Sequence, residues 1–593
     1  MRSTGRCRPR VENLPPRRSL PAAPALALAA LAALMALAAI TACGRGASSP
    51  GAGAPAGGDG GAASRPRNPD ALQLLFTYGS EKEDWIKEVT ARFNDGGFKT
   101  AAGKPIYVEA VAEGSGESID ELLSGSRKAH LTSPASAAFI KLGNAESRTH
   151  TGKDLIGPTQ NLVLSPVVIA MWKPMAEAIG WGTRPVGWSD ILSLAREPRG
   201  WAAHGHPEWG PFKLGHTHPE YSNSGLISLL AETYAAAGKL TGLGLADVER
   251  PQTAAYVSGI ESAIVHYGSS TGFFGKKMFE KGPGYLSAAV LYESLVIEST
   301  SPKYQLPFPV VAIYPKEGTF WSDHPVGVVE REWVTPEHRE AAKVYIDYLL
   351  ARPQQERAMQ FGFRPSAVEL PLTAPFDAAH GVDPKQPQTT LEVPPVEVID
   401  AVRKLWHQNK KRSQITLVLD ISGSMNDEHK LENAKAGAEQ LITQLDADDT
   451  FSFLPFNNRL DWAAQGVALR DARDKALATL RGVFASGGTA LYEAVAEAYD
   501  YQRRLAAREP GKISAVVVLT DGEDTDSTLK LRDLLAKIGG GSESQNIPVF
   551  TIGYGRDANR QVLEQIAAAT GARFYVGTPE NIRSVFREIS TFF

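Results

Sequence analysis

The stretch SQITLVLDISGSM, residues 413–425, decides the fold of the C-terminal part of the chain. Residues 415–419 are an apolar, β-branched run that predicts a buried strand, and Asp420, Ser422 and Ser424 follow it directly. A second apolar run, 513–519, leads to Asp521. Because further apolar strands alternate with helical patterns up to residue 593, we expect a mainly parallel sheet with helices on both faces, a doubly wound α/β fold.

Oxygen-bearing side chains follow the predicted strands at 415–419 and 513–519. In open α/β sheets, ligands bind at the edge where the strands have their carboxyl ends. Thr489, in the segment SGGTALY, begins a predicted helix and adds a third hydroxyl to the two carboxylates. Such a set suits Mg²⁺ (or Mn²⁺), whereas the lack of Cys and His at these positions disfavours zinc. The alternatives are that each residue is only a helix cap or turn residue, or that a metal bound here serves stability alone.

At these residues the segment resembles the von Willebrand factor type A (VWA) domain, whose metal-ion-dependent adhesion site has the pattern D-x-S-x-S, then T, then D. The stretches LVLDISGSM, SGGTALY and VVVLTDGEDT carry the resemblance. It implies a Rossmann-like domain over 413–593 that holds Mg²⁺ (or Mn²⁺), with a carboxylate of a protein partner completing the metal shell. The implied metal residues are Asp420, Ser422, Ser424, Thr489 and Asp521.

Residues 71–385 form a second, larger domain in which strands are followed by small or hydroxyl-bearing turns and then by helices. The segments LLFTYGSEKEDWIKEVTARFN, LVLSPVVIAMWKP, IVHYGSSTG and QQERAMQFGFRP resemble type II periplasmic solute-binding proteins. The resemblance implies two α/β lobes with a cleft between them. We expect the chain to cross between the lobes near 163–171 and again near 307–314.

The expected cleft would bind an unidentified small solute through hydroxyls at helix starts, where backbone N–H groups donate hydrogen bonds to anions or carbonyl oxygens. An ordinary turn with a helix N-cap is the alternative at each position. Oxyanions, carbohydrates and amino-acid-like molecules all suit such a site. The candidate residues are Ser80, Ser115, Ser136, Ser222, Asn223, Ser224 and Tyr292.

Four of the twelve histidines fall within fifteen residues: His204, His206, His216 and His218. They could form a zinc site. A polar loop of the cleft is the favoured interpretation, because Pro, Gly and Trp surround them and no cysteine or carboxylate pattern accompanies them.

The N-terminus has the pattern of a secretory signal: a basic region is followed by an uncharged apolar run over 25–42. The run ends at Thr-Ala-Cys43-Gly, which resembles the bacterial lipobox, so we expect lipidation of Cys43 and removal of 1–42; a retained signal anchor is the competing interpretation. Residues 43–70 are rich in Gly, Ala and Pro and predict a flexible tether, and 386–412 predict a linker.

The net charge of −4 excludes a generally basic nucleic-acid binder, and two cysteines in 593 residues exclude a disulfide scaffold. No nucleophile triad, phosphate-binding loop or paired acid and base is evident, so we expect no enzyme. The sequence therefore predicts a binding protein of the cell envelope with a Mg²⁺-dependent protein partner. We expect it to be lipid-anchored on the outer side of the cytoplasmic membrane, or to be a periplasmic or outer-membrane lipoprotein. The alternatives are the solute receptor of an ABC permease and, less favoured, a Mg²⁺-dependent enzyme.

Overall fold

The computed structural model describes residues 70–366, 369–540, 547–555, 557–579 and 581–593. The predicted signal peptide, Cys43 and the predicted tether up to residue 69 lie outside these residues. Within the described ranges, no helix is both long enough and apolar enough to cross a membrane.

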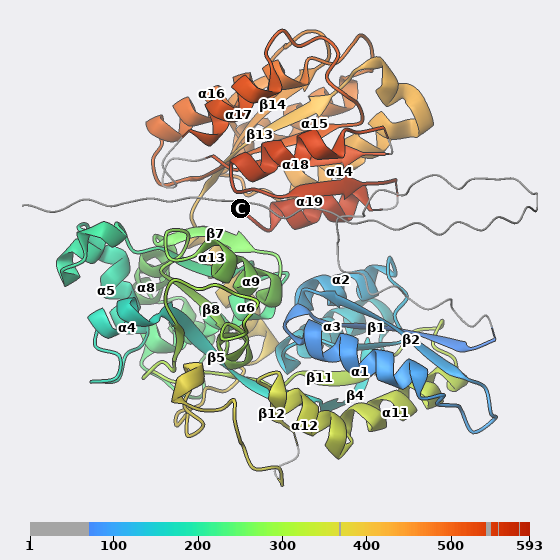
Figure 1. Cartoon of the computed structure of the whole chain (residues 1–593), viewed down its shortest axis with the longest axis vertical. Helices are drawn as coiled ribbons and strands as arrows, with labels where there is room; N and C mark the ends of the chain where they lie inside the picture. The colour runs from blue at the N-terminus through green and yellow to red at the C-terminus, as the bar shows by residue number, and fades with distance from the viewer. Residues whose placement is uncertain (1–69, 367–368, 541–546, 556, 580) are drawn as a thin grey trace, which may run out of the picture. The chain divides into compact units, whose positions relative to one another are not determined.

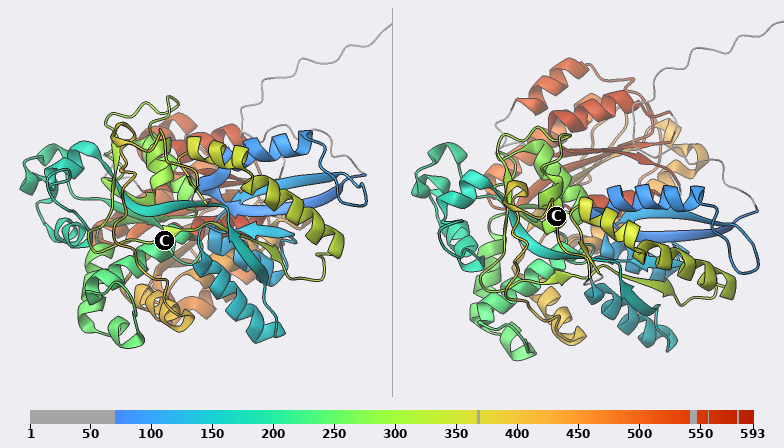
Figure 2. Two further views of the ribbon diagram at one scale, coloured as in Figure 1. Left: turned by 90° about the horizontal axis from the view of Figure 1, so that it is seen from below. Right: turned by 60° about the horizontal axis from the view of Figure 1, so that its bottom comes forward.

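The first lobe is built on a five-stranded sheet of order β2-β1-β3-β11-β4, in which β1 pairs in parallel with β2 and β3. Helices α11 and α12 come from far along the chain but pack with α1, next to the same sheet (Figures 1 and 2). The elements are β1 Leu72–Gly79, a 3-10 turn at Ser80–Lys82, α1 Glu83–Asp95, β2 Ile106–Glu113, α2 Ser115–Ser124, β3 Leu131–Ser133, α3 Ala137–Thr151, β4 Ile156–Asn161, β11 Pro325–Val329, α11 Pro336–Leu350 and α12 Arg352–Gln360.

The second lobe has its own sheet of order β10-β5-β8-β6-β7, with β9 and β12 paired to β5. The chain enters this lobe at Val163, as expected, but β9 and β10 still belong to its sheet, so the return to the first lobe falls after Ser322 rather than at 307–314. The elements are β5 Val163–Trp172, α4 Lys173–Ala178, α5 Trp188–Arg196, β6 Leu214–Thr217, α6 Asn223–Ala237, α7 Leu245–Val248, α8 Pro251–Glu261, β7 Ile264–Gly268, α9 Thr271–Lys281, β8 Ala288–Tyr292, α10 Glu293–Glu298, β9 Val310–Ile313, β10 Trp321–Ser322 and β12 Arg364–Pro365.

Helix α13, Val396–Asn409, lies in the predicted linker and packs on α6, α7 and α8 of the second lobe. Its apolar residues recur at helical spacing, and Val398, Ile399, Val402 and Trp406 are buried. This part of the linker is therefore an ordered helix with its own packed face.

The C-terminal domain has a six-stranded sheet of order β15-β14-β13-β16-β17-β18, and only β15 runs antiparallel to its neighbour. Both central strands are almost wholly buried, which explains their continuous apolar sequences. The elements are β13 Ser413–Asp420, a 3-10 segment at Gly423–His429, α14 Lys430–Gln444, β14 Thr450–Phe456, β15 Ala464–Ala468, α15 Leu469–Gly482, α16 Leu491–Arg508, β16 Ile513–Thr520, α17 Leu531–Gly539, β17 Val549–Tyr554, α18 Arg560–Ala569, β18 Phe574–Gly577 and α19 Ile582–Ser590.

Candidate metal centre and the cleft between the lobes

The two aspartates of the candidate metal centre lie side by side at the carboxyl edge of the C-terminal sheet. Strands β13 and β16 pair in parallel, with Leu419 opposite Leu519, so Asp420 ends one strand and Asp521 lies one residue past the end of the other, at the same edge of the sheet. Neither side chain is exposed to solvent.

A chain of short hydrogen bonds joins four of the five predicted residues. The Asp420 carboxylate accepts the backbone N–H of Ser422 at 2.7 Å. The hydroxyls of Ser422 and Ser424 lie 3.2 Å apart, and the Ser424 hydroxyl donates to Asp521 Oδ1 at 2.8 Å. The backbone of the 3-10 segment thus holds two hydroxyls between two carboxylates that are 101 positions apart in the sequence.

Thr489 lies on a loop next to this group. Gly423 donates its backbone N–H to the carbonyl of Gly487 at 2.9 Å, which fixes the loop beside the serines. The N–H of Thr489 itself binds Thr525 Oγ1 and Asp526 Oδ2. Among the described residues, no hydrogen bond links the Thr489 hydroxyl to the other four side chains, so the structure brings Thr489 near them without joining it to them.

Lys430, the first residue of α14, is a member of the group that sequence reasoning missed. Its ammonium lies 2.7 Å from Asp521 Oδ2 and 3.4 Å from Asp557, and its side chain is only 6% exposed. Burial disfavours its charge, but the hydrogen bond and attraction of Asp521 outweigh burial and raise the pKa of Lys430. A hydropathy pattern does not predict that a lysine at the start of a helix is buried. The sequence therefore carried no clear signal for the contact between Lys430 and Asp521.

Charge at the site favours a cation beside Asp420. Burial raises the pKa of Asp420 to about 6, and no described positive group compensates its carboxylate as Lys430 compensates Asp521. Carboxylate and hydroxyl oxygens at one edge are the donors that a hard divalent ion prefers. The residues present therefore fit Mg²⁺ by their chemistry.

In the second lobe, the predicted cleft residues meet one another rather than an open space. The Asn223 amide donates to the Tyr292 hydroxyl at 2.9 Å and to Ser322 at 3.1 Å. Thr271 joins the network, with its hydroxyl 3.0 Å from Ser224, 3.2 Å from Ser222 and 3.3 Å from Tyr292. All of these side chains are buried. Thr271 and Ser322 were not predicted, although Thr271 stands in the segment IVHYGSSTG that carried the resemblance.

The two lobes touch directly across the cleft. The Ser80 hydroxyl lies 2.8 Å from that of Ser270 and accepts the N–H of Gly272 at 3.0 Å. The N-terminus of α2 donates from Gly116 to the carbonyl of Tyr221 at 2.9 Å. A Cβ on Gly116 would lie 1.9 Å from the carbonyl oxygen of Glu220, so only glycine allows this approach. The helix N–H that we expected to face a solute is thus bound by the opposite lobe.

Ser115 and Ser136 lie in the first lobe and are not part of the network around Thr271. The Ser115 hydroxyl accepts the N–H of Ala135 at 2.9 Å, and the Ser136 hydroxyl accepts the N–H of Ala138 at 3.1 Å. Ser136 is the N-cap of α3, which is the alternative role that a serine before a helix can have.

The four histidines separate into two unrelated pairs. His204 is exposed, and His206 stacks on Trp209 with ring centroids 3.7 Å apart. His216 and His218 are buried at and just after the end of β6. The structure therefore brings no three of the four together.

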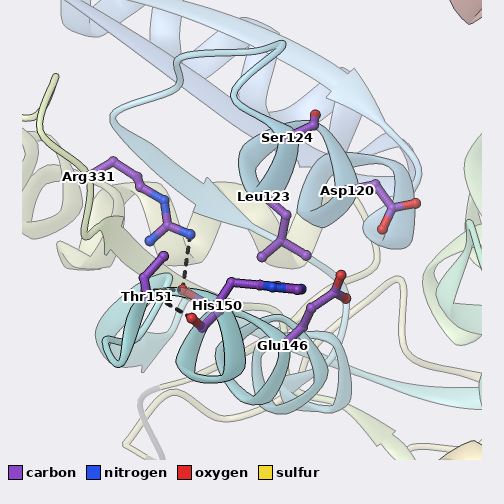
Figure 3. Close-up of a pocket in the computed structure, with 8 residues that line it drawn as sticks. Asp120, Leu123, Ser124, Glu146, His150, Thr151 and Arg331 are labelled. Carbon is purple, nitrogen blue, oxygen red and sulfur yellow. Dashed lines mark hydrogen bonds between the residues drawn. The ribbon is translucent and has the colours of Figure 1, made fainter.

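A hollow of about 380 Å³ lies between α2 and α3 (Figure 3). Arg331 donates to Ser147 at 3.0 Å at one side of it, and Asp120, Glu146 and His150 line the rest. None of the residues predicted for solute or metal lines this hollow.

Comparison with known proteins agrees with both folds. Residues 414–588 match the family model described as von Willebrand factor type A domain, and residues 74–364 match that of bacterial extracellular solute-binding protein. The chain is a solute-binding domain followed by a VWA domain. This combination supports an extracellular binding protein, and both families are of binding or adhesion types.

Individual relatives are similar over parts of the chain. An uncharacterized protein of Synechocystis sp. is 33% identical over 186 residues, which are 31% of this chain and 42% of that protein. An uncharacterized protein of Mycobacterium tuberculosis is 25% identical over 456 residues, 71% of this chain and 62% of that protein. The sulfate-binding protein SubI from Mycobacterium tuberculosis is 18% identical, with 53% of this chain and 92% of that chain covered and a TM-score of 0.35. The chain thus spans about half the length of the two curated relatives.

Proposed function

We propose that this protein is a lipid-anchored extracytoplasmic binding protein whose VWA domain captures an acidic side chain of a protein partner. The observation that carries the proposal is the chain of hydrogen bonds from the Asp420 carboxylate, through the backbone N–H and hydroxyl of Ser422 and the hydroxyl of Ser424, to the Asp521 carboxylate. It lies at the sheet edge where α/β folds bind their ligands.

In this proposal Asp420, Ser422, Ser424, Thr489 and Asp521 hold Mg²⁺ (or Mn²⁺). When bound, the ion supplies an electrophilic centre that attracts a carboxylate oxygen. The chain's own residues orient the site: β13 and β16 fix the aspartates, and the Ser422 N–H keeps Asp420 turned toward the serines. Lys430 neutralises one aspartate, so the site accepts a further negative group more readily than two bare carboxylates would.

Membrane attachment in this proposal is through lipid on Cys43, which lies outside the described residues. The support is the apolar run followed by the lipobox-like cysteine. Cys43→Ser is expected to abolish incorporation of labelled palmitate and to release the chain from the membrane fraction. Membrane retention of an unlabelled Cys43→Ser chain would instead favour the retained signal anchor.

The test of partner capture is a pull-down from envelope extract with the full chain. A partner should be retained in Mg²⁺ and released in EDTA, and Asp420→Ala should not retain it. Ser270→Ala, a substitution in the cleft, is the matched control and should leave capture unchanged. Capture that is indifferent to both EDTA and Asp420→Ala would contradict the proposal.

A small solute held by the first domain is the second candidate, supported by the family match over 74–364. The hydroxyls that would bind it are paired with one another, so a solute must open the contact between Ser80 and Ser270. A rise in the melting temperature with an oxyanion, sugar or amino acid would favour this role, and a receptor of an ABC permease with it. The absence of any rise across such a panel would leave the VWA domain as the binding module.

A further inference from the structure

Three buried side chains of the second lobe come together away from the candidate metal centre and the cleft network. His216 lies in β6, Glu232 in α6, and Glu261 is the last residue of α8. Each is at most 1% exposed, and one ligand atom from each lies within 4.8 Å of the others. His216 and Glu261 can pair with each other at 2.9 Å, but no ion pair among the described residues involves Glu232, and burying a charge without a partner or a metal is costly.

A hydrogen bond to the backbone fixes the orientation of the His216 imidazole. Its Nδ1 lies 2.7 Å from the carbonyl oxygen of Thr217, which can only accept, so Nδ1 carries a proton. The other nitrogen, Nε2, points at Glu261 Oε1 at 2.9 Å. A histidine that donates one N–H to a backbone carbonyl and presents its other nitrogen to carboxylates has the arrangement of a metal-ligating histidine.

The two glutamates are held in different ways. Glu261 Oε2 accepts the hydroxyl of Tyr267 at 2.7 Å and the indole N–H of Trp406 at 3.3 Å, which leaves Oε1 directed at His216. Glu232 Oε1 accepts the hydroxyl of Ser228 at 2.8 Å, whereas Glu232 Oε2 is buried and has no hydrogen-bond partner among the residues that the structure describes. A buried carboxylate oxygen without a partner is uncommon, and at Glu232 it coincides with two further ligand atoms within 4.8 Å, which is the arrangement that a cation would bind.

We propose that His216 Nε2, Glu232 and Glu261 hold a divalent first-row metal ion of the zinc type. One imidazole with two carboxylates is a donor set that Zn²⁺ accepts, and surrounding hydrogen bonds from Thr217, Tyr267, Trp406 and Ser228 orient the donors. The site differs in kind from the edge of the VWA sheet, whose donors are all oxygens and suit Mg²⁺. It is also independent of the proposed function, because none of its residues belongs to that domain.

Burial gives the ion a particular behaviour. Because all three ligands are closed off from solvent, the metal enters as the domain folds and leaves slowly. EDTA at room temperature should therefore remove the metal ion from the VWA domain but not the metal ion from this buried site. The ion would also hold α13 to the lobe, since Trp406 of α13 donates to one of its ligands.

The experiment uses the full chain produced in zinc-supplemented medium, dialysed against EDTA and then against excess Mg²⁺, with zinc measured by mass spectrometry. Wild type should retain about one zinc per chain. Glu232→Gln keeps the size of the side chain but removes the anionic oxygen, and should lower retained zinc by about tenfold or more. Glu113→Gln, at a buried carboxylate of the first lobe, is the matched control and should retain zinc as wild type does.

A folded wild-type chain that retains far less than one zinc would overturn the proposal, and so would a Glu232→Gln chain that retains as much as wild type. Cobalt gives a readout that does not depend on the variant. Wild type produced with Co²⁺ should show visible absorption bands of a nitrogen- and oxygen-ligated ion that survive EDTA. If Glu232→Gln fails to fold, the presence of these bands in wild type supports the proposal and their absence rejects it.

Discussion

The edge of the VWA sheet and the cleft between the lobes both gather hydroxyls at the ends of strands, but they balance their polar groups differently. In the cleft, neutral groups such as Asn223, Thr271 and Tyr292 donate to and accept from each other. At the VWA edge, the buried Asp420 carboxylate faces hydroxyls, and none of the described positive side chains compensates its charge. The neutral network leaves the Asn223 amide oxygen without a hydrogen-bond partner among the described residues, but a buried neutral atom without a partner costs less than a buried carboxylate without a positive one. The difference teaches that clustered hydroxyls alone do not mark a site that requires a ligand.

The response to Mg²⁺ is the first test of this contrast. Asp420→Asn removes the anionic oxygen at little change of shape, so Mg²⁺ should no longer stabilise the chain. Wild type should gain about 2.7 kcal/mol at a Mg²⁺ concentration one hundred times the Kd. Thermal denaturation with and without Mg²⁺ measures this stabilisation in Asp420→Asn and in wild type. Ser270→Ala should respond as wild type; an equal response of Asp420→Asn would place Mg²⁺ elsewhere.

Removal of the Lys430 ammonium should make the stability of the folded chain depend more strongly on Mg²⁺. Lys430→Met leaves Asp521 buried and unpaired, which should cost about 4 kcal/mol in EDTA. Mg²⁺ should restore more stability to this variant than to wild type, because the ion then replaces the lost charge. Chemical denaturation in EDTA and in Mg²⁺ measures the two effects.

The exposed pair of Lys343 with Asp347 gives the control for Lys430. Its lysine is 73% exposed, so Lys343→Met should change stability by about 0.5 kcal/mol or less. A Lys430→Met chain that is as stable as this control in EDTA would show that Lys430 does not neutralise the site.

A pH effect tests a buried carboxylate of the first lobe, that of Glu113, the last residue of β2. Burial raises the pKa of Glu113 to about 8, in spite of Arg127 at 3.3 Å. The folded chain therefore holds this proton more tightly than the unfolded chain does, and the stability that this gives is lost as pH rises from about 4.5 to about 8. Glu113→Gln should remove the loss, on the order of 3 kcal/mol near neutral pH.

Denaturation of both chains at a series of pH values measures this difference. The two curves should agree below about pH 4.5, where Glu113 is protonated in both states. Parallel curves over the whole range would mean that Glu113 is ionised in the folded chain.

The last substitution, Gly116→Ala, is designed to break the contact between the two lobes. Gly116→Ala places a methyl group against the Glu220 carbonyl, so the lobes must separate, at a cost of about 2 kcal/mol. Small-angle X-ray scattering should show a larger radius of gyration. Gly482→Ala, where a Cβ meets no atom within 4 Å, is the control and should not change the scattering. An unchanged Gly116→Ala profile would mean that the lobes do not meet there in solution.

The sequence predicted more of the VWA domain than of the cleft, for a physical reason. The predicted strands 415–419 and 513–519 lie within β13 and β16, because buried parallel strands are apolar at every position. The edge strand β15 was missed because it is short and half exposed. Ligation of metal by the five motif residues stays a prediction.

In the cleft, sequence reasoning located Ser222, Asn223 and Tyr292 but not their partners Thr271 and Ser322. Asn223 pairs with Ser322, 99 positions away, and no local pattern encodes such a contact. The histidines show the same limit. Neighbouring histidines were grouped together, whereas His216 meets a glutamate 45 positions further on. Short motifs at strand ends are readable, but pairings between distant elements need the fold.

The order of the C-terminal sheet has a consequence for fluctuations. Strands β13 and β16 are its two central strands, flanked by β14 and β17, with β15 and β18 at the edges. Edge strands open most easily in local unfolding, whereas central strands open only with the whole domain. The backbone amides of β13 and β16 should therefore be among the slowest in the domain to exchange with deuterium. Asp420 and Asp521 would keep their relative position through every smaller opening of the sheet.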